Sequence, residues 1–257
     1  PDTDEGFVCR GGLFRGQGFN IPDQNNAYVD AQHYVEVPTS GSLSPLAQTQ
    51  QLTISGWIKP EASGDLTVIH KGQGFPSQEY QVAINGGNLN ATFWDLYGGE
   101  RVININSTLT EGNWYFFGVT AEPVGNSGQM RANAYLFSSS GALLDSREEK
   151  FKDFFSSGGG PRAENYHDNK SFDGPLVLGA ERFGMNASPV NFFDGVIDEI
   201  RIHDGVLGQN DLESILNETR ECSDVSEAVL PAFDNFESYQ PGSSIGENGG
   251  TNWGGPW

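Results

Sequence analysis

The residues best suited to hold a ligand lie close together between Trp94 and Arg101. Alternation along a strand predicted over residues 88–95 turns Trp94 away from the apolar side chains, and Tyr97 lies in the Gly-rich turn that follows. An aromatic ring can stack on the apolar face of a sugar, while Asp95 and Arg101 could bond its hydroxyls. The pattern favours a glycan-binding site. The alternative is a Trp94 that is covered by the polar segment 148–174 and serves structure alone.

Asp198 is the second residue of interest. Alternation through a strand predicted over residues 192–203 places Asp198 on the same face as Ile200 and Ile202. A carboxylate on an apolar face must be hydrogen-bonded, paired or bound to a metal. Asp198 is therefore either a metal ligand, a cap on nearby backbone amides or the partner of Arg201.

The sequence carries no recognisable catalytic motif. It has neither a Gly-x-Ser-x-Gly elbow nor a phosphate-cradling loop, and the neighbours Asp198 and Glu199 should point to opposite faces of a strand. No paired metal-binding spacing occurs among the four histidines, which are His33, His70, His167 and His203. We therefore expect a protein that is not an enzyme.

The charge balance narrows the classes of partner. The 257 residues include 14 Lys and Arg against 34 Asp and Glu, a net charge of −20. This charge excludes a non-specific nucleic-acid binder and disfavours anionic membrane surfaces. The longest strongly apolar stretch, residues 114–121, is far shorter than the ~20 residues of a spanning helix, so no membrane insertion is expected. No signal peptide is visible from Pro1, and we expect a mature or trimmed secreted chain.

Short alternating runs separated by Gly, Pro, Asn and Asp predict an all-β fold, a two-sheet antiparallel jelly-roll sandwich. One short C-terminal helix is expected from a capping box at residues 210–213 and an apolar stripe of Leu212, Ile215 and Leu216. Residues 148–174 are too polar and Gly-rich for strands and are interpreted as a long surface loop. Strands are expected over residues 33–37, 51–58, 79–84, 88–95, 101–106, 113–121, 129–137, 142–147, 175–180 and 192–203.

Four stretches in three parts of the chain together resemble one family. They are HYVEVPTSGSL (33–43) with LTISGWIKPE (52–61), EGNWYFFGVT (111–120), and FDGVIDEIRIHDGVLGQNDLESI (193–215). Their order and spacing resemble the concanavalin A-like, laminin G-like sandwich family over about residues 13–222. This resemblance assigns structural roles to Trp57 and Trp114, which fall within the matching strings.

The resemblance also implies a structural calcium. In the family, the Asp that matches Asp198 helps to hold the ion together with an N-terminal Asp and backbone carbonyls. Here Asp30 and the loop at Ser42 are the candidates for those partners. Calcium prefers six to eight hard oxygen ligands, which carboxylates and loop carbonyls supply.

The family hosts several functions, so three hypotheses stay open. The preferred one is a non-catalytic, extracellular or cell-surface module that binds a glycan or polysaccharide and carries calcium. The second is a structural subunit of a surface assembly that contacts other copies through residues 223–257. The third is a polysaccharide hydrolase or lyase. Against it, the chain lacks both the Glu-x-Asp-x-x-Glu strand of jelly-roll glucanases and the Gln-x-His strand of jelly-roll alginate lyases.

Two cysteines, Cys9 and Cys222, lie near the ends of the predicted domain. A disulfide between them would close a very long loop, which restricts the unfolded chain strongly; two free buried thiols are the alternative. The expected organisation is an N-terminal extension (1–12), the sandwich (13–222) and a linker or tail (223–257) that leads into a further domain or pairs with another copy. Possible N-glycosylation sequons begin at Asn90, Asn106, Asn169, Asn186 and Asn217.

Overall fold

A computed structural model describes residues 34–74, 76–156, 173–182, 184 and 188–220. Three short strands before this range are defined by their backbone only: β1 (Gly12–Phe14), β2 (Ile21–Pro22) and β3 (Tyr28–Val29). The chain divides into two compact units, Pro1–Arg220 and Glu221–Trp257. Every element described below belongs to the first unit.

The described part of the chain is built mainly from β-strands. The strands are β4 (Val35–Val37), β5 (Leu52–Pro60), β6 (Leu66–Lys71), β7 (Tyr80–Asn85), β8 (Asn88–Trp94), β9 (Glu100–Thr108), β10 (Tyr115–Pro123), β11 (Met130–Ser138), β12 (Leu143–Phe151), β13 (Leu176–Leu178) and β14 (Gly195–His203). The helices are η1 (Gly41–Leu43), α2 (Pro45–Gln48) and α4 (Gln209–Arg220).

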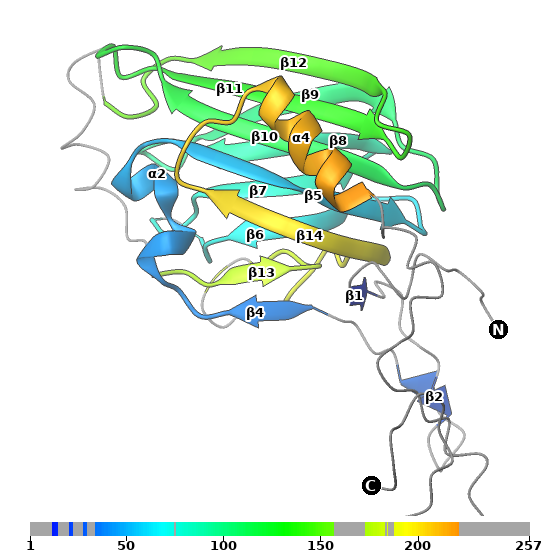
Figure 1. Ribbon diagram of the computed structural model, residues 1–257. Coiled ribbons are helices and arrows are strands. Elements are labelled where there is room, and N and C mark those ends of the chain that lie inside the picture. Colours follow the sequence, from blue (N-terminus) through cyan, green and yellow to red (C-terminus); the bar gives the residue numbers. More distant parts are fainter. Residues whose placement is uncertain are drawn as a thin grey trace, which may run out of the picture. The chain divides into compact units, whose positions relative to one another are not determined.

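The strands form two antiparallel sheets that pack face to face (Figure 1). The first sheet has the order β1-β14-β5-β10-β11-β12, and the second has the order β4-β13-β6-β7-β8-β9. The predicted all-β sandwich with one short helix near the C-terminal end is therefore confirmed. No helix of the described residues combines the length and the apolar character that crossing a membrane requires.

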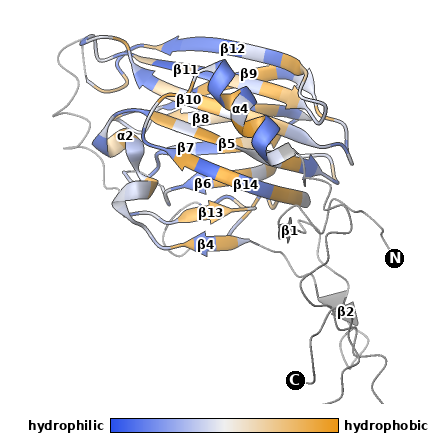
Figure 2. Ribbon diagram, in the orientation of Figure 1, coloured by the Kyte–Doolittle hydropathy of each residue, from blue (hydrophilic) through white to orange (hydrophobic). Residues whose placement is uncertain are grey.

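One large apolar core fills the space between the sheets. β5 shows how alternation builds it, because Leu52, Ile54 and Ile58 face the core while Trp57 faces outward. The chain colours in Figure 2 follow this division, with apolar residues along the strands and polar residues on the exposed side of α4. Burial of these side chains contributes roughly 25 cal/mol per Å² of apolar surface and is the main term that holds the sheets together.

α4 covers a second, smaller apolar cluster on the outer face of the first sheet (Figure 1). Leu212 and Leu216 pack there on Trp57, whose indole Nε1–H donates to Thr219 Oγ1 at 2.8 Å. Trp114 lies edge-on to Trp57 with ring centroids 6.4 Å apart, so the structural roles expected for both tryptophans are confirmed.

The start of α4 differs from the predicted capping box. Gln209 is the first helical residue, and the Gly208 N–H donates to Asp211 Oδ2 at 2.9 Å. Glu213 instead accepts from the side chain of Gln209 at 2.8 Å. The helix was thus predicted correctly, but the carboxylate that satisfies its first backbone amide lies two residues earlier than expected.

A β-bulge in β14 overturns the predicted orientation of Asp198. Pairing with β5 shifts between Asp198 and Arg201, and Glu199 adopts a positive φ of 50°. The extra residue exchanges the two faces of the strand: Ile197 enters the core before the bulge and Ile200 enters it afterwards. Asp198 therefore does not share the core face of Ile200.

Gly56 makes room for this bulge on the neighbouring strand β5. A Cβ at Gly56 would come within 2.4 Å of Ile200 Cδ1 and 3.2 Å of the Asp198 carbonyl oxygen. Ile200 therefore fills the space that a side chain would otherwise occupy in the core. The bulge in β14 therefore depends on the glycine in the string LTISGWIKPE.

Two further predictions about secondary structure were wrong. Residues 148–151 continue strand β12 instead of beginning a surface loop, and Phe154 and Phe155 are buried in the core. Strand β6 was not predicted, because all six of its residues are buried and a register shift between Thr67 and Ile69 breaks the alternation.

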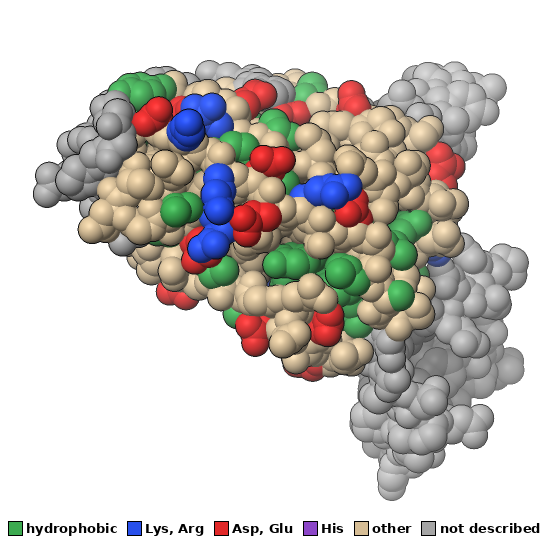
Figure 3. Space-filling view, turned by 90° about the horizontal axis from the view of Figure 1, so that it is seen from above, with side chains coloured by type: hydrophobic (Ala, Val, Ile, Leu, Met, Phe, Trp, Pro, Cys, Tyr) green, Lys and Arg blue, Asp and Glu red, His purple; other side chains and the backbone are tan. Residues whose placement is uncertain are grey.

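β12 and β9 lie together along one edge of the sandwich. Asp145 of β12 accepts the backbone N–H of Asn106 in β9 at 2.8 Å. Arg147 Nη2 lies 3.4 Å from Asp145 Oδ2, and Lys150 Nζ lies 3.4 Å from Glu148 Oε1. Figure 3, which looks down on this side, shows basic side chains interspersed with acidic ones. Charged side chains of this kind protect an edge strand from pairing with another chain.

Candidate functional site

The main candidate site is a groove on the outer face of the second sheet. The lining residues of β6, β7 and β8 alternate with residues that face the core, so they point away from the sandwich interior. The groove has a volume of about 370 Å³, within the usual range for small-ligand sites. Its described lining combines carboxylates, amides, hydroxyls and one indole: Asp65, Thr67, Gln81, Asn85, Thr92, Trp94, Glu100, Val102, Glu181 and Asn191.

Glu181 is the most buried carboxylate of the groove, with 5% of its surface exposed. The Asn191 side-chain amide donates to Glu181 Oε2 at 2.7 Å and holds the carboxylate in place. Burial raises the pKa of Glu181, and the negative charges of Glu100 and Asp65 raise it further, while hydrogen bonds from Asn191 and Gln81 oppose the shift. Glu181 thus lies close enough to Glu100 and Asp65 for their negative charges to act on it.

Trp94 faces the groove, but it is only 2% exposed. Its ring packs edge-on against His70, with centroids 5.7 Å apart. The predicted direction of Trp94, away from the core, is correct. Its expected exposure is wrong, because the outer face of this sheet is itself covered here, and so little indole surface remains that it cannot stack flat on a sugar ring.

The turn between β8 and β9 presents Tyr97 to solvent, with 62% of the residue exposed. Asp95 organises this turn, since its Oδ1 accepts the backbone N–H of Tyr97 at 2.9 Å and that of Gly99 at 2.8 Å. Its Oδ2 accepts from Arg101 Nη2 at 2.6 Å. A Cβ at Gly99 would lie 2.7 Å from Asp95 Oδ2, so this approach requires glycine.

The structure therefore divides the four predicted ligand-binding residues into two kinds. Asp95 is buried, and both its oxygens and the Arg101 guanidinium serve the turn. Tyr97 follows Trp94 by three residues and precedes Glu100 by three, and both of those residues line the groove. Tyr97 is the predicted aromatic residue with a ring free to stack, and Asp95 and Arg101 hold it in position.

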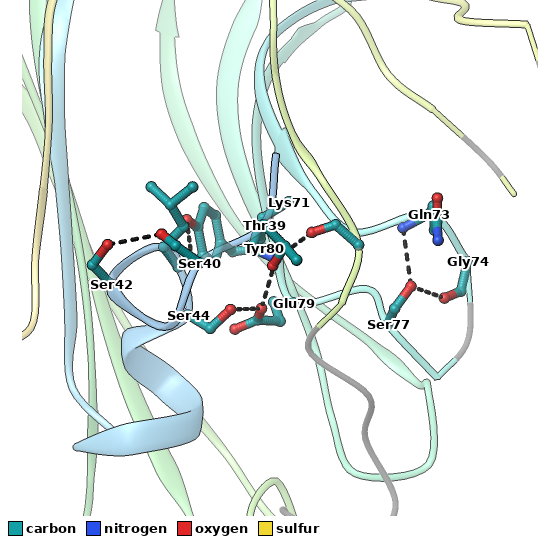
Figure 4. Close-up of polar contacts among 12 residues, drawn as sticks. Thr39, Ser40, Ser42, Ser44, Lys71, Gln73, Gly74, Ser77, Glu79 and Tyr80 are labelled. Atoms are coloured by element: carbon teal, nitrogen blue, oxygen red, sulfur yellow. Dashed lines mark hydrogen bonds and ion pairs between the residues drawn. The ribbon is translucent and has the colours of Figure 1, made fainter. Parts of the chain in front are cut away.

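A buried ion pair occupies another part of the sandwich, between β6 and the residues before β7 (Figure 4). Lys71 Nζ lies 3.4 Å from Glu79 Oε1, and both side chains are fully buried. Ser44 Oγ donates to the same Glu79 oxygen at 2.6 Å, while Lys71 Nζ donates to Thr39 Oγ1 at 3.3 Å and to the Gly174 carbonyl. Burial lowers the pKa of Lys71, and the charge of Glu79 opposes that shift.

This network joins the η1–α2 segment to the second sheet. The Tyr80 hydroxyl adds a bond to the Leu43 carbonyl at 2.8 Å. A hollow of about 410 Å³ lies beside the network, and Thr39, Ser44 and Asp173 are among its lining residues. Sequence reasoning missed the network because Lys71 and Glu79 lie on the two sides of a turn whose course only the folded chain defines.

The calcium prediction receives no physical support from the described residues. Asp198 Oδ1 accepts the Glu199 N–H at 2.8 Å, and Ser42 Oγ lies 2.9 Å from Ser40 Oγ. Asp30 lies outside the described residues. Within the part of the chain that the structure describes, no three His, Cys, Asp or Glu side chains meet in a way that could hold a metal ion. The burial argument for Asp198 fails at the bulge, and calcium stays a prediction that rests on the family resemblance.

The remaining predicted positions are only partly described. Cys9, Cys222, Asn169 and Asn186 lie outside the described residues. Asn106 and Asn217 are exposed, so a glycan could be attached to either. Asn90 is 4% exposed on β8, which leaves no room for a glycan in the folded domain and corrects its place among the candidate sequons.

Comparison with known proteins identifies the fold. A family model described as the concanavalin A-like lectin/glucanases superfamily matches residues 29–176. No curated protein sequence matches the chain. Among solved structures, one of botulinum neurotoxin type C, described as entering cells through interaction with two ganglioside molecules, aligns with a TM-score of 0.50 and 15% identity. That alignment covers 82% of this chain and 45% of the toxin chain.

Two other structures show weaker likeness. The LG1–3 region of the laminin α2 chain aligns with a TM-score of 0.49 and 16% identity, over 76% of this chain and 31% of that one. A heptameric SAP-like pentraxin from Limulus polyphemus aligns with a TM-score of 0.44 and 15% identity, over 65% of this chain and 69% of that one.

Proposed function

The chain belongs to the concanavalin A-like lectin/glucanases superfamily, and on that premise we propose that it is a non-catalytic glycan-binding module whose ligand occupies the groove on the second sheet. The lining of the groove is the main support for this proposal. Amides, hydroxyls and carboxylates from β6, β7, β8, β9 and neighbouring loop segments surround a volume of about 370 Å³. Sugars present hydroxyl groups that such side chains can bond from several directions.

Tyr97 supplies the stacking surface in this proposal. It is exposed in the β8–β9 turn, three residues from each of the lining residues Trp94 and Glu100, and Asp95 and Arg101 hold that turn in place. An aromatic ring of this kind contributes about 1 kcal/mol beyond its buried area. Because the turn is already ordered, binding would cost little additional conformational entropy.

A glycan array, run with and without calcium, tests the proposal first. Affinity for the best ligand should then fall about tenfold in Tyr97→Ala, the effect of losing one stacked ring. Tyr34→Ala is the matched control, because Tyr34 is also an exposed tyrosine but directly precedes β4, which lies at the opposite end of the second sheet from β9. If Tyr34→Ala weakens binding as much as Tyr97→Ala, or if no glycan binds the folded protein, the proposal fails.

One observation favours a second function, glycoside hydrolysis in the same groove. Acid catalysis of this reaction uses a carboxyl with a raised pKa together with a second carboxylate. Burial and the charges of Glu100 and Asp65 raise the pKa of Glu181 in just this setting. Release of reducing ends from the bound polysaccharide, abolished in Glu181→Gln, would support hydrolysis over simple binding. Binding without any release supports the non-catalytic module.

We also place this module outside the cell, in keeping with laminin G-like domains, and keep calcium as a proposed structural ion. Assembly through residues 223–257, which lie outside the described residues, stays a second hypothesis. Sedimentation of the full chain and of a chain ending at Arg220 would test it, since assembly through the tail requires a difference between the two.

A further inference from the structure

We infer that the groove selects glycans that carry protonated amino groups, such as polymers of glucosamine with free amines, over neutral or acidic glycans. This inference rests on the proposed function and adds the chemical class of the ligand. It follows from where the acidic side chains of the groove lie and from an unused hydroxyl in its floor.

Three carboxylates line the groove from three separate parts of the chain. Asp65 precedes β6, Glu100 begins β9, and Glu181 follows β13, where it is bridged to Val190. Asp65 and Glu100 are exposed and lie at the rim of the groove, whereas Glu181 is buried in its wall. None of the described lining residues is a Lys or an Arg. The nearby Arg182 is ion-paired with Glu36.

The floor of the groove adds an independent sign of a ligand. Thr92 lines the groove and is 6% exposed, and its hydroxyl has no hydrogen-bond partner among the described residues. The residue as a whole is buried, but its hydroxyl oxygen is not sealed from solvent and opens onto the groove, so a ligand there can reach it. It can accept a hydrogen bond from an ammonium group, and it can donate a hydrogen bond to a sugar hydroxyl or accept one from it.

A protonated amine would suit both the carboxylates of the groove and the free hydroxyl of Thr92. An ammonium group offers three donors and no acceptor, whereas ionised carboxylates only accept. The carboxylates also repel one another: burial is the main cause of the raised pKa of Glu181, and the negative charges of Glu100 and Asp65 raise it further. A cation between them would relieve this repulsion, whereas the carboxylate or sulfate of an acidic glycan would increase it.

Three β-1,4-linked oligosaccharides of equal length provide a sharp test, because they differ only at carbon 2. Cellohexaose carries a hydroxyl there, the N-acetylglucosamine hexamer a neutral amide, and the glucosamine hexamer an amine. Titration calorimetry of the full chain at about pH 6 and low salt should show the glucosamine hexamer binding roughly tenfold more tightly than cellohexaose, as expected for one or two charge-assisted hydrogen bonds. Glu100→Gln and Glu181→Gln should each remove most of that advantage.

The net charge of −20 attracts any cation, so a control must separate this effect from the groove. Glu149→Gln removes one exposed charge from β12, on the other sheet, and should leave the advantage unchanged. Binding of the amine should also release protons, since it lowers the pKa of Glu181, and titrations in two buffers of different ionisation enthalpy measure that release.

The outcomes distinguish this inference from the function on which it rests. If cellohexaose binds as tightly as the glucosamine hexamer, the charge argument is overturned while glycan binding stands. Equal losses in Glu149→Gln and Glu181→Gln would likewise overturn it, because the attraction would then be non-specific. If none of the three sugars and no array glycan binds the folded chain, the proposed function itself fails.

Discussion

His70 should make the domain lose stability as the pH falls below neutrality. Its side chain is fully buried against Trp94. Burial lowers the pKa of His70 from 6.5 to about 4. A hydrogen bond to Gly72 opposes this shift, and the positive charge of Lys71 adds to it. Between these two values the unfolded chain binds a proton that the folded domain does not. The free energy of unfolding therefore falls through this window, by about 3 kcal/mol in total.

The substitution His70→Phe isolates this contribution, because phenylalanine keeps a ring against Trp94 and cannot be protonated. Urea unfolding followed by circular dichroism from about pH 7 to about pH 4 should show a shallower fall in stability for the variant, the difference reaching about 3 kcal/mol.

Carboxylates that titrate in the same range affect the wild type and the variant alike, so only the difference between them is informative. If His70→Phe does not fold, His70→Gln serves as the second non-titrating variant. Parallel loss of stability in the wild type and the folded variant would show that His70 is protonated in the native state. The reasoning from burial would then be refuted.

Four other outcomes are expected. Trp94→Ala should lower the free energy of unfolding by roughly 3–5 kcal/mol, because the indole is buried, and a variant as stable as the wild type would contradict this. Lys71→Ala should cost a similar ~3–5 kcal/mol, since it leaves a buried carboxylate uncompensated; a loss below ~1 kcal/mol in chemical unfolding would argue against the ion pair. If calcium is bound at Asp198, EDTA should lower the melting temperature by several degrees and Asp198→Ala should abolish that effect, whereas identical melting curves with and without EDTA would exclude it. Intact-mass analysis should show a two-hydrogen deficit for a Cys9–Cys222 disulfide, and two thiols that can be alkylated without reduction would contradict the bridge.

Alternation predicted most of the sandwich, because strands with one buried face repeat every two residues. β9 and β11 follow this rule, since buried residues alternate with more exposed ones along most of each strand, and both were predicted within two residues. The rule fails at bulges, where one additional residue exchanges the faces. The bulge in β14 reversed the interpretation of Asp198, and the register shift in β6 hid an entire strand.

The candidate site was less predictable than the fold. The sequence indicated the direction of Trp94 and the turn that carries Tyr97, since both depend on local pattern. It could not indicate the burial of Trp94, which depends on neighbours such as His70 from another strand. The groove itself brings together residues from Asp65 to Asn191, and their proximity follows only from the order of strands in the second sheet.

The place of β14 in the first sheet has a consequence for how this domain folds during synthesis. β14 pairs with β5, about 140 residues earlier in the chain, and α4 then covers Trp57 of that same strand. A ribosome that has released only residues before β14 therefore displays β5 with an open edge and an uncovered tryptophan. Such non-local pairing slows folding and prolongs the exposure of β5 to aggregation until the last strand emerges.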